Sequence, residues 1–141
     1  MNDDQWTVRA IGRVSSELSD RESAPMQGDE GAPAAWITFA DDVRPALAGV
    51  REGDRLVVLT WLHLADRGAL QVHPRDDERL PLTGVFRTRS SDRPNPIGLH
   101  GVTVLAVEPD RLRVEPLEAV DGTPVLDVKV ELGPSRRTAS P

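Results

Sequence analysis

The sequence contains no cysteine, so disulfide bonds, thiolate metal ligands and a cysteine nucleophile are all excluded. It also has no GxGxxG stretch and no alternation of strands with helices, which are the marks of a Rossmann-type cofactor site. No apolar run approaches the roughly 20 residues that a membrane-spanning helix needs. No basic and apolar leader precedes the first expected strand. We therefore expect a cytoplasmic protein that binds no membrane.

Positive charge is also in short supply. Lysine and arginine together number 17 against 23 aspartates and glutamates, which gives a formal net charge of −6. Contacts to nucleic-acid phosphates come from lysine and arginine, so the overall charge argues against nucleic-acid binding. One local exception stands out, because Arg87, Arg89 and Arg93 fall close together in a stretch whose one acidic residue is Asp92.

This basic cluster belongs to residues 84–99 (GVFRTRSSDRPNPIGL), in which two prolines bracket Asn95. Each proline fixes its own φ at about −65° and pushes the preceding residue towards an extended conformation. We expect a stiff loop between two strands that holds Asn95 in place and offers guanidinium groups to an anion. The alternative is a rigid surface turn with solvated arginines.

The remaining sequence is typical of an all-β protein with many turns. Expected strands, chosen for alternation or β-branched content, occupy residues 7–14, 35–39, 55–62, 69–73, 102–107, 112–114 and 125–132. A short helix is expected through Val43, Ala46 and Leu47, with Asp41 or Asp42 as its cap. These elements predict an all-β, mainly antiparallel fold, a small β-barrel with long loops and little helix.

Histidine gives no metal signal. His63 follows the hydrophobic strand expected over residues 55–62, and His73 lies too far along the chain for a recognisable ligand spacing. No acidic cluster joins the two residues, so no metal site is expected. A histidine at the end of a strand is more often a structural hydrogen-bonding residue than a catalyst.

Two ordered motifs carry a resemblance to a known family. Residues 84–99 and residues 121–129 (DGTPVLDVK) resemble the patterns GVFATRSPxRPNPIGLS and DGTPVLDIKPY of the TsaA-like (TrmO-type) family. The likeness extends more weakly to residues 10–14 (AIGRV) and covers about residues 7 to 130. Members of that family are S-adenosylmethionine-dependent methyltransferases. They act on N6 of threonylcarbamoyl-adenosine in the tRNA anticodon loop and form small β-barrels that are usually homodimers.

The resemblance implies S-adenosyl-L-methionine as cofactor, tRNA as partner and a homodimer. It implies one TsaA-like barrel domain over residues 1–132, followed by a flexible tail over residues 133–141. The implied cofactor contacts are Pro25, Met26, Gln27, His63, Leu64, Arg89, Leu99, Leu117, Glu118 and Ala119. In these roles Arg89 pairs with the cofactor's carboxylate or orients the loop. Leu99 packs on the adenine, and Glu118 accepts hydrogen bonds from the ribose hydroxyls.

Further residues are candidates for binding the methyl acceptor and for catalysing the transfer. Arg87, Arg93 and Asn95 are candidates for substrate binding, because they would face the acceptor base or the anticodon phosphates. Asn95 and Asp121 are the candidate catalytic residues, with Asp121 as a possible proton acceptor. An aspartate before a glycine is more often a turn former, so the structural interpretation of Asp121 also stands.

The chain departs from the family pattern at several positions. Met26 stands where the family has arginine, and Leu64 stands where it has glutamine. Acidic residues replace basic ones at residues 76–78 (DDE), and the tyrosine that ends the second motif is missing. Two alternatives to the tRNA enzyme therefore stay open. One is a methyltransferase of a small metabolite, and the other is a non-catalytic binding module on the same barrel.

Overall fold

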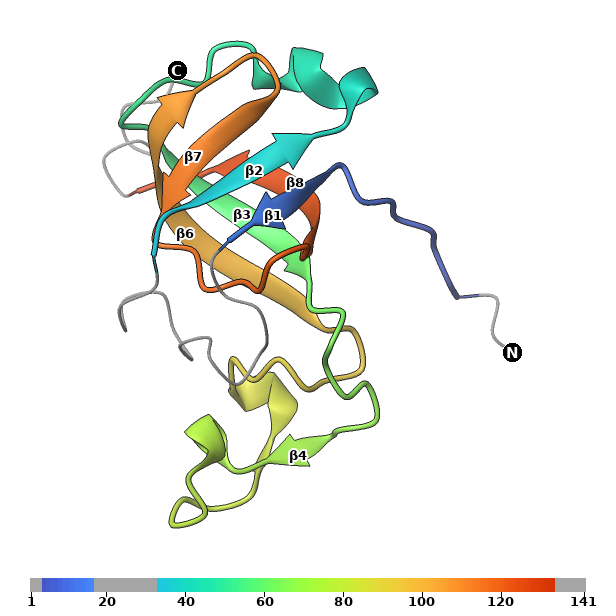
Figure 1. Cartoon of the computed structure of the whole chain (residues 1–141). Helices are drawn as coiled ribbons and strands as arrows, with labels where there is room; N and C mark the ends of the chain where they lie inside the picture. Colours follow the sequence, from blue (N-terminus) through green and yellow to red (C-terminus); the bar gives the residue numbers. More distant parts are fainter. Residues whose placement is uncertain (1–3, 17–32, 134–141) are drawn as a thin grey trace.

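The computed structural model describes residues 4–16 and 33–133. In this part of the chain, antiparallel strands close into a barrel in the order β1-β2-β7-β6-β3-β8 (Figure 1). The barrel strands are β1 (Gly12–Ser15), β2 (Ala35–Phe39), β3 (Arg55–Trp61), β6 (Ile97–Val107), β7 (Arg111–Glu115) and β8 (Pro124–Val130). The all-β barrel expected from the sequence is confirmed.

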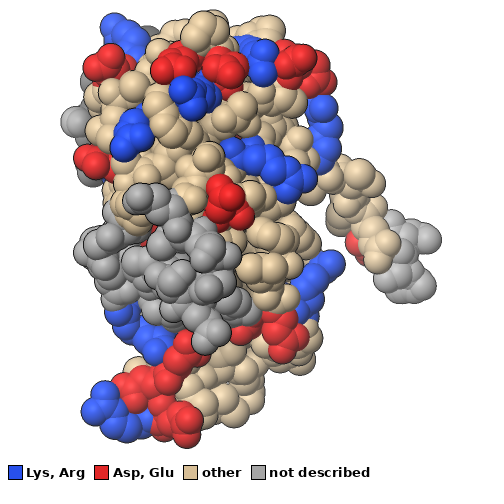
Figure 2. All heavy atoms as spheres, viewed as in Figure 1, with Lys and Arg blue, Asp and Glu red and all other residues tan. Residues whose placement is uncertain are grey.

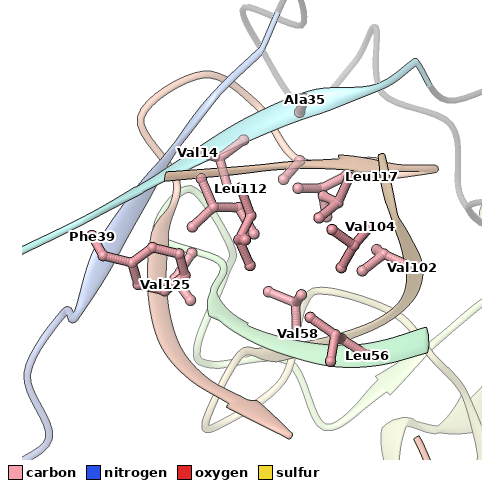
Figure 3. Close-up of a cluster of buried hydrophobic side chains, with 13 residues drawn as sticks. Val14, Ala35, Phe39, Leu56, Val58, Val102, Val104, Leu112, Leu117 and Val125 are labelled. Carbon is pink, nitrogen blue, oxygen red and sulfur yellow. The ribbon is translucent and has the colours of Figure 1, made fainter. Parts of the chain in front are cut away.

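Aliphatic side chains fill the barrel because successive residues of a strand point to opposite faces of the sheet. Ile37, Val58 and Val114 are 0% exposed, and the same holds for Leu117 in the segment between β7 and β8. Side chains from all around the barrel point into its interior, with Phe39 and Val125 on one side of the cluster and Val102 and Val104 on the opposite side (Figure 3). Burial of such side chains contributes about 1.5–3 kcal/mol each.

Strand β8 interrupts the alternation that its sequence predicts. Val58 and Thr60, two residues apart on the inner face of β3, pair with Val128 and Val125, which are three residues apart on β8. The extra residue is a β-bulge, which turns Val125 into the core although the sequence pattern puts it on the polar face. The expected alternation over residues 125–132 is therefore wrong at Val125, which is 0% exposed.

Two expectations near the ends of elements are also corrected. The strand expected over residues 7–14 begins only at Gly12. Ile11 is still hydrogen-bonded to Val125 and Ala40, and the described residues before it extend away from the barrel without strand structure (Figure 1). The expected short helix is the 3-10 helix η2 (Asp41–Leu47), but its N-cap is Ala40, with no side-chain capping bond. Asp41 instead pairs with Arg44 at 2.9 Å.

Between β3 and β6 the chain leaves the barrel, and we refer to residues 62–96 as the excursion. It contains β4 (Gln71–Val72), η3 (Pro74–Asp76), β5 (Thr83–Gly84) and η4 (Val85–Arg87), with β4 and β5 paired in a two-stranded sheet. The strand expected over residues 69–73 is thus shortened to β4. Among the described residues, no helix has the length and apolar content for a membrane crossing. The excursion lies below one end of the barrel (Figure 1).

Candidate functional site

Arg93 organises the loop that joins η4 to β6. Its guanidinium donates hydrogen bonds to the carbonyl oxygens of Val85 at 2.6 Å, Ser90 at 2.8 Å and Thr88 at 3.3 Å. A planar guanidinium with several donors is suited to binding several carbonyls of one loop at the same time. Arg93, which the sequence proposes for substrate binding, therefore has both terminal nitrogens engaged within its own loop.

Arg67, which the sequence analysis does not single out, fastens the tip of this loop. Its Nε donates to the carbonyl of Pro94 at 2.8 Å, and its NH2 group donates to Oδ1 of Asn95 at 3.1 Å. The guanidinium also lies over the ring of Trp61, 5.0 Å from its centroid. Asn95 is exposed, and its amide orientation is fixed because its oxygen is engaged, which leaves the amide nitrogen as a donor.

Arg89 and Leu99, two of the implied cofactor contacts, are neighbours. Arg89 donates to the backbone carbonyl of Leu99 at 3.2 Å, and both side chains are exposed. Leu99 lies on the outer face of β6, where it pairs across the sheet with Leu59. Arg87 is exposed on the last residue of η4. This arrangement leaves further donors of Arg89 for an anionic group beside an apolar surface.

His63 and Leu64 follow β3 directly and lie next to the same loop. The backbone N–H of Leu62 donates to the carbonyl of Pro96 at 2.8 Å, which ties the start of the excursion to its end. His63 and Leu64 are both exposed there. We refer to the loop between η4 and β6, residues 88–96, as the arginine loop. The structure thus brings His63 and Leu64 to the arginine loop although more than twenty residues separate them from Arg89 in the sequence.

A second group of predicted residues lies in the segment between β7 and β8. Leu117 and Ala119 are 0% and 2% exposed, so their side chains belong to the core and only their backbones are available to a ligand. Glu118, between them, points the other way and is joined to His100 on β6. Oδ1 of Asp121 accepts a hydrogen bond from the backbone of Ser16 at 3.0 Å, which agrees with a structural role in the turn.

Pro25, Met26 and Gln27 lie outside the described residues. The described chain stops at Ser16 and resumes at Pro33, and both of these residues are hydrogen-bonded to the segment between β7 and β8. Ser16 donates to Asp121, and the carbonyl of Pro33 accepts from the backbone of Leu117 at 3.2 Å. Ser16 and Pro33 are the described residues that come before and after the triplet in the chain. Both are therefore hydrogen-bonded to the segment between β7 and β8, which contains Glu118.

A buried polar chain connects the two groups. Oγ1 of Thr60 lies 2.8 Å from Nε2 of His100, and Nδ1 of His100 lies 3.3 Å from Oε1 of Glu118. The His100 and Glu118 side chains are 5% and 17% exposed. Neither Thr60 nor His100 is among the site residues predicted from the sequence. A signal was available, since His100 shares the parity of the buried residues Val102 and Val104 on one strand.

Charge on the visible face is mixed. Acidic and basic side chains alternate over the barrel and over the excursion, and no broad basic area covers this face (Figure 2). In the excursion, Asp77 and Arg79 form an exposed ion pair at 2.9 Å. The hydrogen bond from the Arg79 side chain holds the pKa of the Asp77 carboxyl below its usual value.

A separate cleft of about 770 Å³ opens beside η2 and β8. Its lining includes Val43, Leu47, Arg55, Lys129 and Glu131. None of the described residues predicted for the cofactor or the substrate lines this cleft. The predicted site and the cleft are therefore different parts of the surface.

Comparison with known proteins defines the class. The profile described as "tRNA-methyltransferase O N-terminal domain" matches residues 13–132. A probable S-adenosyl-L-methionine-binding protein of Methanothermobacter thermautotrophicus is 39% identical over 129 residues, which cover 92% of each chain. An S-adenosyl-L-methionine-binding protein of Archaeoglobus fulgidus is 40% identical over 124 residues, 86% of each chain. Among solved structures, TrmO from Pseudomonas aeruginosa superposes with a TM-score of 0.75 at 26% identity.

The barrel and the two motif segments thus define a methyltransferase class that uses S-adenosylmethionine without a Rossmann fold. Within that class, the chain belongs to the TrmO family, and it matches the family's N-terminal domain. The family, the barrel fold and the family's cofactor, all expected from the sequence, are confirmed. The alignment with the Pseudomonas structure covers 100% of this chain but only 61% of that protein, so the chain spans about three fifths of its length.

Proposed function

We propose that this chain is an S-adenosylmethionine-dependent methyltransferase whose acceptor is N6 of threonylcarbamoyl-adenosine in the anticodon loop of tRNA. The observation that carries the proposal is that residues next to the two motifs are in contact. Arg89 donates to Leu99 at the end of the first motif, and the next residue, His100, contacts Glu118, three residues before the second motif. Family membership adds the cofactor and the acceptor class, which are named for the relatives rather than for this chain.

The bound cofactor would supply an electrophilic methyl group on a sulfonium. The chain's own task is alignment, because a displacement in line with the sulfur gains most of its rate from positioning. In the proposed site, Arg89 binds the cofactor's carboxylate, Leu99 packs on the adenine, and Glu118 accepts from the ribose. Asn95, held by Arg67, orients the acceptor base through its amide nitrogen.

The acceptor nitrogen loses its proton as it gains the methyl group, so a nearby base is useful. Asp121 is the candidate for this role. One of its oxygens accepts from Ser16, which leaves the other for the acceptor. Asn95 is an amide and takes no proton, so its proposed part is positioning.

The charge of the chain makes a small metabolite the second candidate for the methyl acceptor. The net charge of −6 and the mixed face in Figure 2 favour the metabolite. The family favours tRNA. Binding of a tRNA would weaken steeply with added salt, since lysine and arginine contacts release counterions. Salt-independent turnover would favour the metabolite.

The proposal includes the homodimer and the cytoplasmic location expected from the sequence. Exposed apolar side chains at the arginine loop and its surroundings give a second copy a surface to cover. They include Leu70, Leu82, Phe86, Ile97 and Leu99, which are 45–89% exposed. Size-exclusion chromatography with light scattering measures the mass of the particle in solution. A mass equal to one chain would remove the dimer from the proposal.

Calorimetric titration with S-adenosylmethionine tests the proposed function. We expect a saturable affinity in the micromolar range, about −8 kcal/mol. Arg89→Ala should weaken binding at least tenfold while the melting temperature stays unchanged, because Arg89 is exposed and makes a single hydrogen bond to the backbone. Arg87→Ala, an exposed neighbour assigned to the acceptor, is the matched control for the cofactor titration. No binding by the wild-type protein at millimolar cofactor would overturn the proposal in favour of the non-catalytic binding module.

A further inference from the structure

We infer that His100 and Thr60 are positioning residues for Glu118, and that they turn its second carboxylate oxygen into a fixed acceptor for a hydroxyl of the cofactor's ribose. The inference rests on the proposed function, because it concerns the cofactor proposed there. It adds two residues on the inner face of the barrel that neither sequence motif nor comparison assigns. The chain of contacts is Thr60 to His100 to Glu118.

The first step is the direction of the hydrogen bonds. An ionised carboxylate has only acceptors, so Nδ1 of His100 is the donor in its 3.3 Å contact with Oε1 of Glu118. In the neutral imidazole the other nitrogen is then an acceptor, and the Thr60 hydroxyl donates to it at 2.8 Å. Thr60 therefore fixes the tautomer and the ring, and the ring fixes one oxygen of Glu118.

The second step concerns the oxygen that is left over. Oε2 of Glu118 is buried and has no hydrogen-bond partner among the residues that the structure describes. Leaving a buried acceptor unpaired is costly, and the cost is greater for a charged group. Oε1 is already held by His100. The free energy lost at Oε2 is recovered when a ligand brings a donor to it, and a ribose hydroxyl is such a donor.

Gly98 provides an independent observation. It faces the barrel interior on β6, directly across from Thr60. A Cβ atom at Gly98 would collide with Oγ1 of Thr60 and would come within 2.7 Å of Nε2 of His100. The hydrogen bond between Thr60 and His100 occupies the space that any other residue's side chain would need. The backbone at this position is thus compatible with the polar pair only as glycine.

The position of the pair in the barrel also favours a role in the site over a purely structural one. Thr60 and His100 stand near the end of the barrel from which the excursion leaves, one residue from Trp61 and from Leu99 respectively. Deeper inner positions of the same strands are aliphatic, as at Val58, Val102 and Val104. An apolar pair would fill the inner face equally well, but it would leave Oε1 of Glu118 without the donor that holds it.

Two histidine variants separate positioning from packing. The amide nitrogen of His100→Asn takes the place of Nδ1 and keeps the donor to Glu118, whereas the longer His100→Gln keeps only a partner for Thr60. We expect His100→Gln and Glu118→Gln to weaken S-adenosylmethionine binding at least tenfold in calorimetry, and His100→Asn to stay within threefold of the wild type. Thr60→Val, which removes the hydroxyl at nearly constant volume, should weaken binding threefold to tenfold.

A double-mutant cycle shows whether His100 acts through Glu118. The variant carrying both His100→Gln and Glu118→Gln should bind no more weakly than Glu118→Gln alone, because the same interaction is already lost. Val104→Ala is the control, since it damages the same strand away from the polar chain and should leave cofactor affinity unchanged. If the double variant weakened binding by the product of the two single factors, the inference would be overturned. Wild-type affinity in His100→Gln would overturn it as well.

A spectroscopic measurement gives a readout that needs no activity. Nitrogen chemical shifts of the His100 ring should report a proton on Nδ1, and Glu118→Gln should change those shifts. If the wild-type protein binds no S-adenosylmethionine, the proposed function falls and this inference falls with it. If the wild type binds and both His100 variants bind equally well, only the inference falls.

Discussion

The barrel and the excursion are held together by different means. In the barrel, long strands such as β3 and β6 pair over seven positions, and aliphatic side chains fill the interior. In the excursion, β4 and β5 pair over two positions, and Val85 and Pro96 are the only residues of the stretch 62–96 that are buried. Guanidinium groups take the place of a core there, because Arg67 and Arg93 bind backbone carbonyls of residues outside the strands.

Because the two regions are stabilised differently, substitutions in each should affect different properties of the protein. The barrel gains its free energy from burial, which is insensitive to the exact position of any polar group. The excursion gains its shape from a few directed hydrogen bonds, so single substitutions there change the geometry of a loop more than the stability of the fold. The proposed site includes His63 and Leu99, which lie next to the two ends of the excursion, and Glu118, which contacts His100 on β6.

The largest effect is expected in the barrel core. Ile37→Ala removes a side chain that is 0% exposed, and it should lower the free energy of unfolding by about 2–5 kcal/mol through lost burial and a cavity. Phe86→Ala, in the excursion, removes a larger side chain that is 89% exposed, and it should cost less than about 0.5 kcal/mol. Urea unfolding of both variants measures the comparison. Equal losses would show that the excursion has a core of its own.

The sequence predicts the barrel well because its signal is local. Strands at residues 35–39 and 55–62 are found nearly as expected, since their β-branched residues alternate with neighbours of the other face. The start of β6 at Ile97 was missed, because the prolines of the arginine loop hide a strand that begins directly after them. The bulge at β8 was missed as well, because a register shift depends on the partner strand and leaves no local mark.

The candidate site also has residues that the sequence indicates and contacts that only the structure shows. The family resemblance indicates Arg89, Leu99 and Glu118, but it does not show that Arg93 and Arg67 bind residues of the loop itself. Such hydrogen bonds depend on where a long side chain ends in space, and sequence patterns contain nothing about that. The contact from His100 to Glu118 joins residues 18 apart on different segments, so only the closed barrel reveals it.

Removing the guanidinium of Arg93 should give the next largest effect. Arg93→Ala leaves the carbonyls of Val85, Thr88 and Ser90 without this donor, and we expect a loss of about 1–3 kcal/mol, the usual range for a hydrogen bond to a charged group. Hydrogen exchange should speed up at the amides of Thr88 and Ser90. It should stay unchanged in β3 and β6, which do not depend on the loop.

Arg93→Lys is the matched variant for this prediction. It keeps the charge, but a single ammonium group cannot reproduce the planar fork that reaches carbonyls on both sides of the loop. Exchange in Arg93→Lys should therefore resemble that in Arg93→Ala. Full recovery with lysine would mean that charge, and not the geometry of the guanidinium, holds the loop.

A smaller effect is expected at Arg67, whose contacts are exposed. Arg67→Ala removes two hydrogen bonds to residues 94 and 95 and the contact with Trp61, and it should cost about 1 kcal/mol or less. Its consequence for Asn95 is larger, since the amide loses its fixed orientation. We expect turnover to show a raised KM for the methyl acceptor with an unchanged affinity for S-adenosylmethionine. A weakened cofactor affinity would instead place Arg67 in the cofactor site.

The smallest effect concerns the ion pair at the far end of the excursion. The side chain of Arg79, followed by its backbone N–H, lowers the pKa of Asp77 below the value of 3.8 that an unperturbed carboxyl has. Because the folded pKa lies below the unfolded one, the pair's stabilising contribution is complete above the unfolded pKa. It is lost as the pH falls through the folded pKa.

Carbon NMR titration of the Asp77 carboxyl measures this pKa directly. Arg79→Ala should raise the Asp77 pKa towards its ordinary value, but only in part, since the backbone N–H of residue 79 still donates to Oδ1. The pair is exposed and screened by salt, so we expect no measurable change in the unfolding midpoint at neutral pH. An altered unfolding midpoint would mean that the segment between β4 and β5 contributes to the stability of the barrel. The excursion would then not be independent of the barrel in its energetics.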